Sequence, residues 1–291
     1  MIIHYDIADV KPYINWVYFY HAWQLQQPDE QQRIRLEAES FLDACSSRYQ
    51  SHALFHLYDA YSDGDDVVLL VGEGSGERGE KLPFLRQQQA GSDYLCLADF
   101  IAPRNDSRNS PQRHRDTEPP LYFREGSGEE CQLGLFATSV DSKMVSDYDE
   151  DPYNRMMAQL LADRLAEATA ERLHEQVRKT IWGYAKDEQL TIPEMLQERF
   201  QGIRPAVGYP SLPDASLNFL LDRLLQFSQI GITLTESGAM CPHASVSGLM
   251  ISHPESHYFT VGKIGEDQLC DYAHRRDLPI ETIRKFLAAN L

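Results

Sequence analysis

A long segment from Asp151 to about Tyr184 has the pattern of a single helix, and it constrains the fold more than any other feature. Asp151 is a helix-capping acid, and Pro152 suits the first helical position, where its missing N–H costs no hydrogen bond. Apolar residues at helical spacing then form one stripe: Leu161, Leu165, Leu173, Val177 and Ile181. Leu160 and Ala170 lie off this stripe. Because the segment is apolar on more than one side, we expect a central helix.

Short apolar segments on either side of this helix predict an antiparallel sheet. Residues 53–58 and 66–71 flank a turn that contains Asp63 and Gly64, a favoured hairpin sequence. Further strands are expected at 94–100, 132–139, 232–237, 244–252 and 258–261, and further helices at 30–49, 214–227, 266–275 and 280–289. Strands grouped in hairpins, with helices between the groups, predict the α+β class with a mainly antiparallel sheet.

Composition excludes several classes of protein. The 291 residues include 42% hydrophobic and 24% charged types, and no run approaches the roughly 18 apolar residues of a membrane span. The first ten residues lack the basic start of a secretory signal, so a cytoplasmic protein is expected. A net charge of −17 argues against nucleic acid and against an anionic membrane surface.

The cysteines predict neither disulfides nor a zinc site. They are five in number, and no pair has Cys-x-x-Cys spacing: Cys45, Cys96, Cys131, Cys241 and Cys270. We expect reduced, buried thiols.

Two motif-like patterns do not fit the chemistry that they suggest. Residues 74–79 match the Gly-x-Gly-x-x-Gly dinucleotide fingerprint, but neighbouring acids would repel a pyrophosphate and Pro83 interrupts the helix that should follow. His253 and His257 have the i, i+4 spacing of a metal pair, yet Pro254 between them disfavours a helix. We therefore predict a flexible loop at 74–79 and no metal site.

The segment 204–210 carries the most specific chemistry in the chain. Arg204 offers a planar cation that holds a carboxylate through two hydrogen bonds. Gly208 lets the backbone approach a flat ligand, and Pro205 and Pro210 restrict the loop before binding. With the ring of Tyr209, such a loop suits a small zwitterion with an aromatic base, for example S-adenosylmethionine (AdoMet).

This segment resembles the Arg-x-x-x-Gly-Tyr signature of the AdoMet-binding activation domain of cobalamin-dependent methionine synthase. Similar blocks recur in order along the chain at residues 13–16, 85–88, 96–103, 162–167, 182–184, 234–237, 244–248 and 252–254. The resemblance implies a single α+β domain over residues 1–291, with a central twisted antiparallel sheet and surrounding helices. The polar segment 104–120, which lacks large apolar residues, is then a flexible loop between two family-like blocks and not a domain boundary.

The resemblance also implies the binding residues. AdoMet presents an ammonium, two ribose hydroxyls and a sulfonium, and family acids that bind it fall on Glu167 and Glu198. In the family loop, Arg204 binds the carboxylate, and the backbone at Ala206 and Gly208 holds the ligand.

Two tyrosines and one amide complete the implied site. Tyr209 is the expected catalytic residue, facing the cobalamin, and Tyr258 matches a second tyrosine that lines the groove. Asn15 occupies the position of a family aspartate and keeps its acceptor capacity without its charge. From the residues alone, a structural salt bridge is the favoured interpretation of Glu167 and a core aromatic that of Tyr258.

The function implied is reactivation of methionine synthase. In the family, inactive cob(II)alamin is reductively methylated with AdoMet as methyl donor and a reduced flavodoxin-type protein as electron donor. The expected partners are therefore the cobalamin-binding module, which carries the cobalamin, and that electron donor. We expect a stand-alone, methyltransferase-type component that cannot make methionine alone, because the other modules of the synthase have no counterpart in this sequence.

Departures from the family pattern leave alternatives open. Leu212 and Ala215 stand where family members usually have cysteine and histidine. With Asn15, they favour a second hypothesis: a non-catalytic AdoMet-binding or scaffold protein that has lost productive cobalamin contact. A third hypothesis is an ordinary methyltransferase, but that class uses a glycine-rich loop in a parallel sheet, a context missing here.

Overall fold

The computed structural model describes residues 1–72, 78–104 and 131–291. The strands are β1 Ile2–Asp6, β2 Gln50–Asp63, β3 Asp66–Val71, β4 Arg78–Pro83, β5 Gln132–Val140, β6 Thr233–Leu234, β7 Met240–Cys241 and β8 Ser245–Met250. The helices are α1 Ile7–Val10, α2 Trp16–Ala22, α3 Pro28–Cys45, α4 Lys143–Ser146, α5 Pro152–Gln176, α6 Ile192–Met195, α7 Leu217–Leu225, α8 Glu266–Arg275 and α9 Ile280–Phe286. Loops were predicted at 104–120 and 74–79, and residues 105–120 and 74–77 of them lie outside the described residues.

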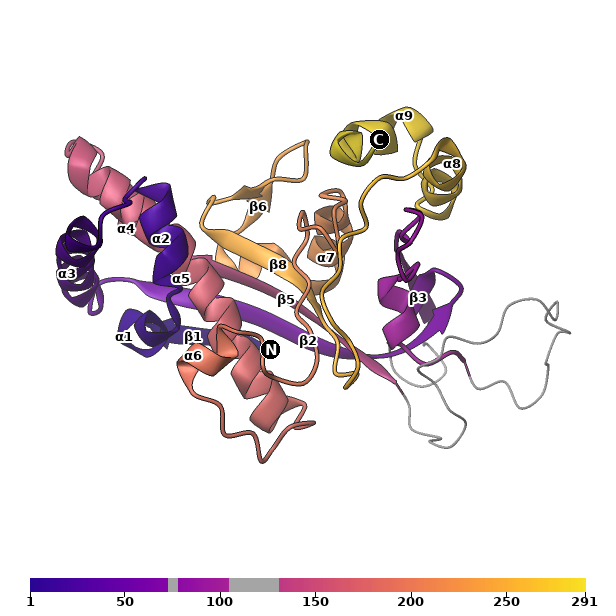
Figure 1. Cartoon of the computed structure of the whole chain (residues 1–291), viewed down its shortest axis with the longest axis horizontal. Coiled ribbons are helices and arrows are strands. Elements are labelled where there is room, and N and C mark those ends of the chain that lie inside the picture. The colour runs from indigo at the N-terminus through magenta and orange to yellow at the C-terminus, as the bar shows by residue number, and fades with distance from the viewer. Residues whose placement is uncertain (73–77, 105–130) are drawn as a thin grey trace, which may run out of the picture. The chain divides into compact units, whose positions relative to one another are not determined.

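The main sheet has the strand order β4-β3-β2-β5-β8, and β1 pairs with β2 (Figure 1). The pairs β1–β2, β2–β3 and β3–β4 are antiparallel. This arrangement confirms the α+β prediction. The predicted hairpin is also confirmed, since Asp63 pairs with Asp66 across Gly64, whose φ is +64°.

The chain divides into two compact units, which are described separately. The first consists of residues 1–56, 135–200 and 216–248, and the second of residues 57–134, 201–215 and 249–291. Three of the five boundaries between them fall inside β2, β5 and β8, and the other two follow residues 200 and 215. The single domain over 1–291 stays a prediction.

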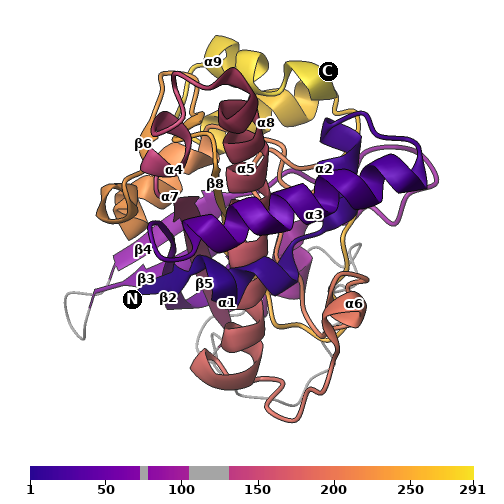
Figure 2. The same ribbon diagram turned by 90° about the vertical axis from the view of Figure 1, so that its left-hand side faces the viewer.

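In the first unit, α5 is the central helix that the sequence predicts. Its cap is the expected one, because the Asp151 carboxylate accepts a hydrogen bond from the Asn154 backbone at 3.1 Å. Helices α2 and α3 lie beside it, and α3 crosses it in Figure 2. Small residues along α5, among them Ala162 and Ala166, are fully buried. A 3.0 Å hydrogen bond from the Thr138 hydroxyl on β5 to the Ala166 carbonyl shows how closely the strand approaches the helix.

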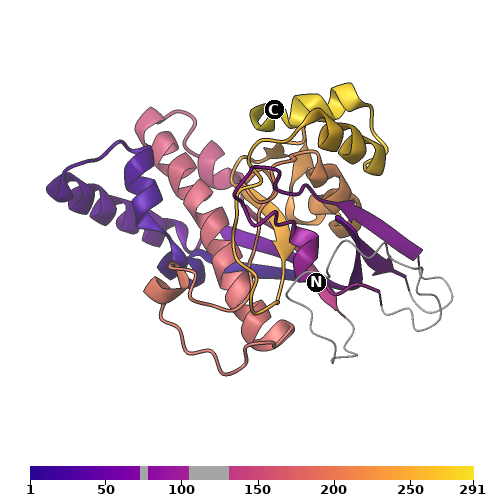
Figure 3. The same ribbon diagram turned by 45° about the vertical axis from the view of Figure 1, so that its right-hand side comes forward.

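In the second unit, α8 and α9 pack together (Figure 3). They share a buried cluster with the segment before α8 and with Leu85, which follows β4. Its members are Leu85, Val261, Ile264, Leu269, Tyr272, Ala273, Ile283 and Leu287. The Tyr272 hydroxyl donates to the buried Asp214 carboxylate at 2.8 Å. Asp214, expected to begin a helix, thus anchors the chain to α8 instead, and α7 begins at Leu217.

Two predicted strands are wrong. In each of them a side chain forms a hydrogen bond with a backbone amide that a strand would use for pairing. Instead of a strand at 94–100, the chain forms a 3-10 helix, Leu97–Phe100. The Asp99 carboxylate accepts the Cys96 amide at 2.8 Å and is held by the Arg86 guanidinium at 2.7 Å. These side-chain hydrogen bonds form a local turn in place of the hydrogen bonds between paired strands.

The second wrong strand is 258–261, which is irregular. Its amides bond to the neighbouring loop, because Phe259 N donates to the Ser211 hydroxyl at 3.2 Å and Val261 N to the Pro210 carbonyl at 2.9 Å. The expected strand at 232–237 is reduced to β6. The five cysteines are free, but only Cys45 and Cys96 are fully buried, so the prediction of buried thiols is wrong for the exposed Cys241 and Cys270.

Substitution of Gly64 tests the hairpin turn. An added Cβ would meet no atom within 4 Å, so only the left-handed backbone opposes a side chain. Asparagine tolerates this conformation, whereas a β-branched residue does not. We expect Gly64→Val to lower the free energy of unfolding by about 1–2 kcal/mol and Gly64→Asn by clearly less, measured by urea denaturation. Equal losses in the two variants would contradict the turn assignment.

Candidate functional site

The loop that carries Arg204 is held along its length by backbone hydrogen bonds in the second unit. Ile203 and Ile251 exchange two of them, at 2.9 and 3.0 Å, and Leu249 N donates to the Pro205 carbonyl at 3.0 Å. The backbone amide of Arg204 donates to the Tyr258 hydroxyl oxygen at 2.9 Å. Arg204 itself is buried, with 9% of its surface exposed. The cation therefore sits on a fixed backbone and not on a mobile loop.

The next turn of this loop presents an open backbone and an exposed ring. Gly208 N donates to the Leu212 carbonyl and Leu212 N to the Tyr209 carbonyl, both at 2.8 Å. Gly208 has a φ of +88°, and no atom lies within 4 Å of the place where its Cβ would be. Tyr209 is 53% exposed. A flat ligand could approach the backbone here without displacing a side chain.

Tyr258 has a second role that the sequence does not reveal. Since 258–261 is not a strand, the expected alternation of Tyr258 and Thr260 on one sheet face does not apply. Instead, the hydroxyl of Tyr258 accepts a hydrogen bond from the Arg204 backbone amide and fixes it.

Leu212, in the family cysteine position, points into the protein, with only 3% of its surface exposed.

In the first unit, Asn15 is the N-cap of α2. Its side-chain oxygen accepts a hydrogen bond from the Val17 amide at 3.2 Å. Asparagine and aspartate are about equally good at this task, so the change from the family aspartate preserves the cap while removing the charge. Sequence reasoning considered only the ligand role of Asn15.

Glu167 lies on the central helix, immediately after the residue that α5 uses to contact β5. The Ala166 carbonyl accepts a hydrogen bond from the Thr138 hydroxyl, and the neighbouring residue Leu165 is fully buried. Glu167 itself is partly buried. The contact to β5 therefore fixes the rotation of α5 at the turn that carries this carboxylate.

Glu198 follows α6 in a strained conformation. Its φ is +58°, which is uncommon for a residue with a side chain. Two residues later, Phe200 packs under the Arg178 guanidinium, 4.3 Å from the ring centroid. Arg178 is fully buried and makes two 2.7 Å hydrogen bonds to the Glu188 carboxylate. Arg178 lies on the π-helical turn Val177–Ile181 that ends α5, so its contacts with Glu188 and Phe200 hold the chain on both sides of Glu198.

A polar cluster on α5 was missed by sequence reasoning. The Glu175 carboxylate accepts hydrogen bonds from the Tyr13 hydroxyl at 2.5 Å, Lys179 Nζ at 2.9 Å and Arg172 Nη1 at 3.2 Å. Burial alone would raise the pKa of Glu175, but the hydrogen bonds from Tyr13 and Lys179 lower it below the ordinary 4.5. The helical spacing of Arg172, Glu175 and Lys179 was visible in the sequence, whereas the partner 162 residues away was not.

Each unit thus brings some of the predicted residues together. In the second unit, Arg204 and Tyr258 are hydrogen-bonded, and Ala206, Gly208 and Tyr209 follow in the same loop. In the first unit, the segment before Asn15 is bonded to α5, the helix of Glu167. That these residues share one ligand stays a prediction.

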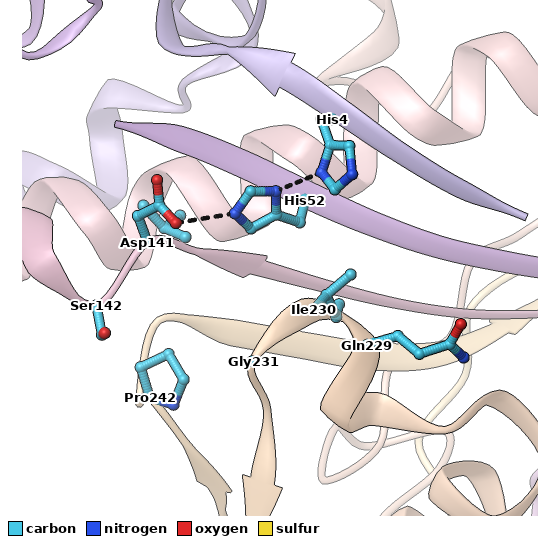
Figure 4. A pocket seen from close by; sticks show the side chains of 9 residues that line it. His4, His52, Asp141, Ser142, Gln229, Ile230, Gly231 and Pro242 are labelled. Atoms are coloured by element: carbon cyan, nitrogen blue, oxygen red, sulfur yellow. Dashed lines mark hydrogen bonds and ion pairs between the residues drawn. The ribbon is translucent and has the colours of Figure 1, made fainter. Parts of the chain in front are cut away.

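A pocket of about 220 Å³ in the first unit is chemically distinct from these residues (Figure 4). His4 and His52 are joined through their Nδ1 atoms at 2.8 Å, and His52 Nε2 lies 3.0 Å from the Asp141 carboxylate. That carboxylate also accepts the Gln50 amide at 2.8 Å, so it ties the strand ends together. The pocket is below the ~300–1,000 Å³ typical of small-molecule sites, and none of its lining residues belongs to the predicted AdoMet set.

The His253 and His257 pair has a structural explanation. Both rings pack around Phe100, with centroids 6.1 and 5.8 Å from it. Across residues 1–72, 78–104 and 131–291, no group of three or more His, Cys, Asp or Glu side chains could hold a metal ion. Nor does any helix in these ranges have the length and apolarity needed to cross a membrane.

Comparisons with known proteins agree on one family. The family model "Vitamin B12 dependent methionine synthase, activation domain" matches residues 6–277. Among solved structures, the crystal structure of the MetH reactivation domain bound to AdoHcy has a TM-score of 0.86 and 34% sequence identity. That match covers 100% of this chain and 90% of the other.

The lowered pKa of Glu175 predicts a pH dependence of stability. A carboxyl whose pKa is lower in the folded state stabilises the fold above its unfolded pKa, and this contribution is lost as the pH falls through the folded value. Wild-type protein should therefore exceed Glu175→Gln in free energy of unfolding at pH 7, and the difference should shrink as the pH falls below 4.5.

Urea denaturation between pH 7 and pH 3 measures this difference. Glu255→Gln, at an exposed carboxylate, is the control. A difference for Glu175→Gln that stays constant over this range would show that the carboxylate charge does not stabilise the cluster.

Proposed function

Because the chain belongs to the vitamin B12-dependent methionine synthase activation domain family, we propose that it binds AdoMet and supports reductive methylation of cob(II)alamin on the cobalamin module of a methionine synthase. AdoHcy, which the related MetH reactivation domain binds, is AdoMet without the transferred methyl group. The two ligands share the amino acid, ribose and adenine parts that the protein must recognise.

The loop of Arg204 is the observation that carries this proposal. A buried guanidinium on a fixed backbone is suited to a carboxylate, because little conformational entropy is lost on binding. The open space at Gly208 leaves its backbone accessible to a flat ring. The residues present therefore fit a zwitterionic nucleoside better than a phosphate, which would need clustered cations.

Each side chain then has a role in placing the methyl donor. Arg204 holds the ligand carboxylate, while Glu167 and Glu198 attract the ammonium and accept hydrogen bonds from ribose hydroxyls. Asn15 contributes an uncharged acceptor. In balance, AdoMet, one electron and cob(II)alamin give AdoHcy and methylcobalamin, so no proton has to be transferred. The work of this chain is positioning, with Tyr209 facing the corrin and Tyr258 lining the AdoMet groove.

Partners follow from this chemistry. The chain needs a cobalamin-binding module and a one-electron donor, which we propose to be a flavodoxin-type protein in the cytoplasm. Since the chain carries a net charge of −17, an acidic donor would have to dock on a locally basic surface.

A second candidate function is AdoMet binding without methyl transfer. It is favoured by the inward position of Leu212, whose side chain is buried and cannot reach a corrin as an exposed polar group would. A scaffold of this kind would bind AdoMet and the cobalamin module without producing methylcobalamin.

Substitution of Arg204 tests the ligand-binding proposal. Arg204→Ala removes a charge-assisted bidentate contact, usually worth about 1.5–3 kcal/mol, so we expect AdoMet affinity to fall about 10- to 100-fold in calorimetry. Lys285→Ala removes an exposed cation on α9 and should bind like wild type. Arg204→Lys, which keeps the charge but not the fork, should be intermediate. Circular dichroism confirms that each variant is folded.

Methyl transfer is measured with a separately expressed cobalamin module, AdoMet and a chemical reductant, by following the corrin spectrum. Wild-type protein should accelerate the appearance of methylcobalamin, and Arg204→Ala should abolish this effect. Binding without acceleration would favour the scaffold function. No binding of wild type at millimolar AdoMet would overturn both candidates.

A further inference from the structure

Two contacts attach the segment around Asn15 to α5. At one end, the Tyr13 hydroxyl donates to Glu175, and the Arg172 guanidinium lies 5.7 Å from the centroid of the Tyr13 ring. At the other end, the Arg164 guanidinium lies 5.9 Å from the centroid of the Tyr18 ring. Tyr13 and Tyr18 are on either side of Asn15 in the chain, so both ends of this short segment are fixed to the same helix.

These contacts bracket both Asn15 in the segment and Glu167 on α5. As the chain advances from Tyr13 to Tyr18, its contacts on α5 move back from Glu175 to Arg164, so the segment runs antiparallel to the helix. Glu167 lies between those two contact points in sequence. At 100° per residue it is about 60° from Arg164 and about 80° from Glu175 around the helix, hence on the same half of its surface.

The link between Tyr13 and Asn15 is short and rigid. The intervening Ile14 is buried, with 2% of its surface exposed, and its amide donates to the Lys11 carbonyl at 3.2 Å. Asn15 then caps α2 through Val17. A displacement of the Tyr13 ring therefore displaces Asn15 as well, because the backbone between them is held in place.

The hydrogen bond between Tyr13 and Glu175 is retained across the physiological pH range. Burial, followed by the hydrogen bond to Glu175, raises the pKa of Tyr13 to about 12, so the hydroxyl remains a donor at any physiological pH. If this hydroxyl is removed, Glu175 keeps Lys179 and Arg172 as partners. Loss of the hydroxyl therefore releases the segment without leaving a carboxylate unpaired.

We propose that Tyr13 is a positioning residue, which sets Asn15 against Glu167 for binding of the AdoMet amino acid or ribose groups through its hydrogen bond to Glu175. This proposal rests on the proposed function. In this role Tyr13 acts through the geometry of the 13–18 segment and not by contact with the ligand.

The chain offers a matched control at Tyr5. Its hydroxyl also donates to α5, to the side chain of Gln176, and burial likewise raises its pKa to about 12. Tyr5 belongs to β1, however, and not to the segment of Asn15. Tyr5→Phe thus removes a comparable, partly buried hydrogen bond to the neighbouring residue of the same helix.

The test compares Tyr13→Phe and Tyr5→Phe in calorimetric titrations with AdoMet and in thermal unfolding. We expect similar, small decreases in the unfolding midpoint for both variants. Only Tyr13→Phe should weaken AdoMet binding, by about 2- to 10-fold, the range expected for one hydrogen bond. Equal effects on affinity in the two variants, or none in Tyr13→Phe, would overturn the proposal.

A double-mutant cycle shows whether Tyr13 acts through Asn15. Asn15→Ser keeps an N-cap oxygen but shortens the side chain. Tyr13→Phe should reduce AdoMet affinity less in the Asn15→Ser background than in wild type. Additive reductions in affinity would contradict the mechanism. If wild type itself does not bind AdoMet, the proposed function fails and this proposal with it. If wild type binds and Tyr13→Phe binds equally well, only the positioning role fails.

Discussion

The packing of α5 against β5 is the constraint on which the candidate site in the first unit depends. Buried alanines let the helix approach the strand closely enough for the Thr138 hydroxyl to reach the Ala166 carbonyl. Larger side chains at these positions would hold the helix away from the strand and break that contact. Since Glu167 follows Ala166 directly, the same packing decides where its carboxylate points. The contacts of Tyr13, Tyr18 and the Arg178–Glu188 pair are all made to this helix or to its π-helical end.

Much of the fold was predictable because its signals are local. The Asp151 cap and Pro152 mark the start of α5, the Gly64 turn defines a hairpin, and α8 has the predicted bounds. The two wrong strands, 94–100 and 258–261, have strand-like patterns. Their backbone groups are captured by Asp99 and by the loop at Ser211, and such competition depends on contacts that a pattern of apolar residues does not contain.

The candidate site was predictable only in part, for the same reason. Residue identity and order were enough to predict Arg204, Glu167 and Glu198 as ligand-binding residues. They were not enough to show which contacts fix the positions of these residues. The N-cap role of Asn15, the Tyr258 bond to the Arg204 backbone and the Tyr13–Glu175 bond join residues in ways that sequence spacing cannot show. Side chains that place a ligand-binding residue are as necessary as the residue itself, because small displacements weaken oriented contacts.

A crystal structure of this chain with AdoHcy tests the central claim most directly. We expect one ligand molecule with its carboxylate on Arg204 and its ring against the backbone at Gly208. A ligand bound elsewhere, for example in the pocket of His4, His52 and Asp141, would contradict the account. So would a ligand on this loop whose carboxylate does not contact Arg204.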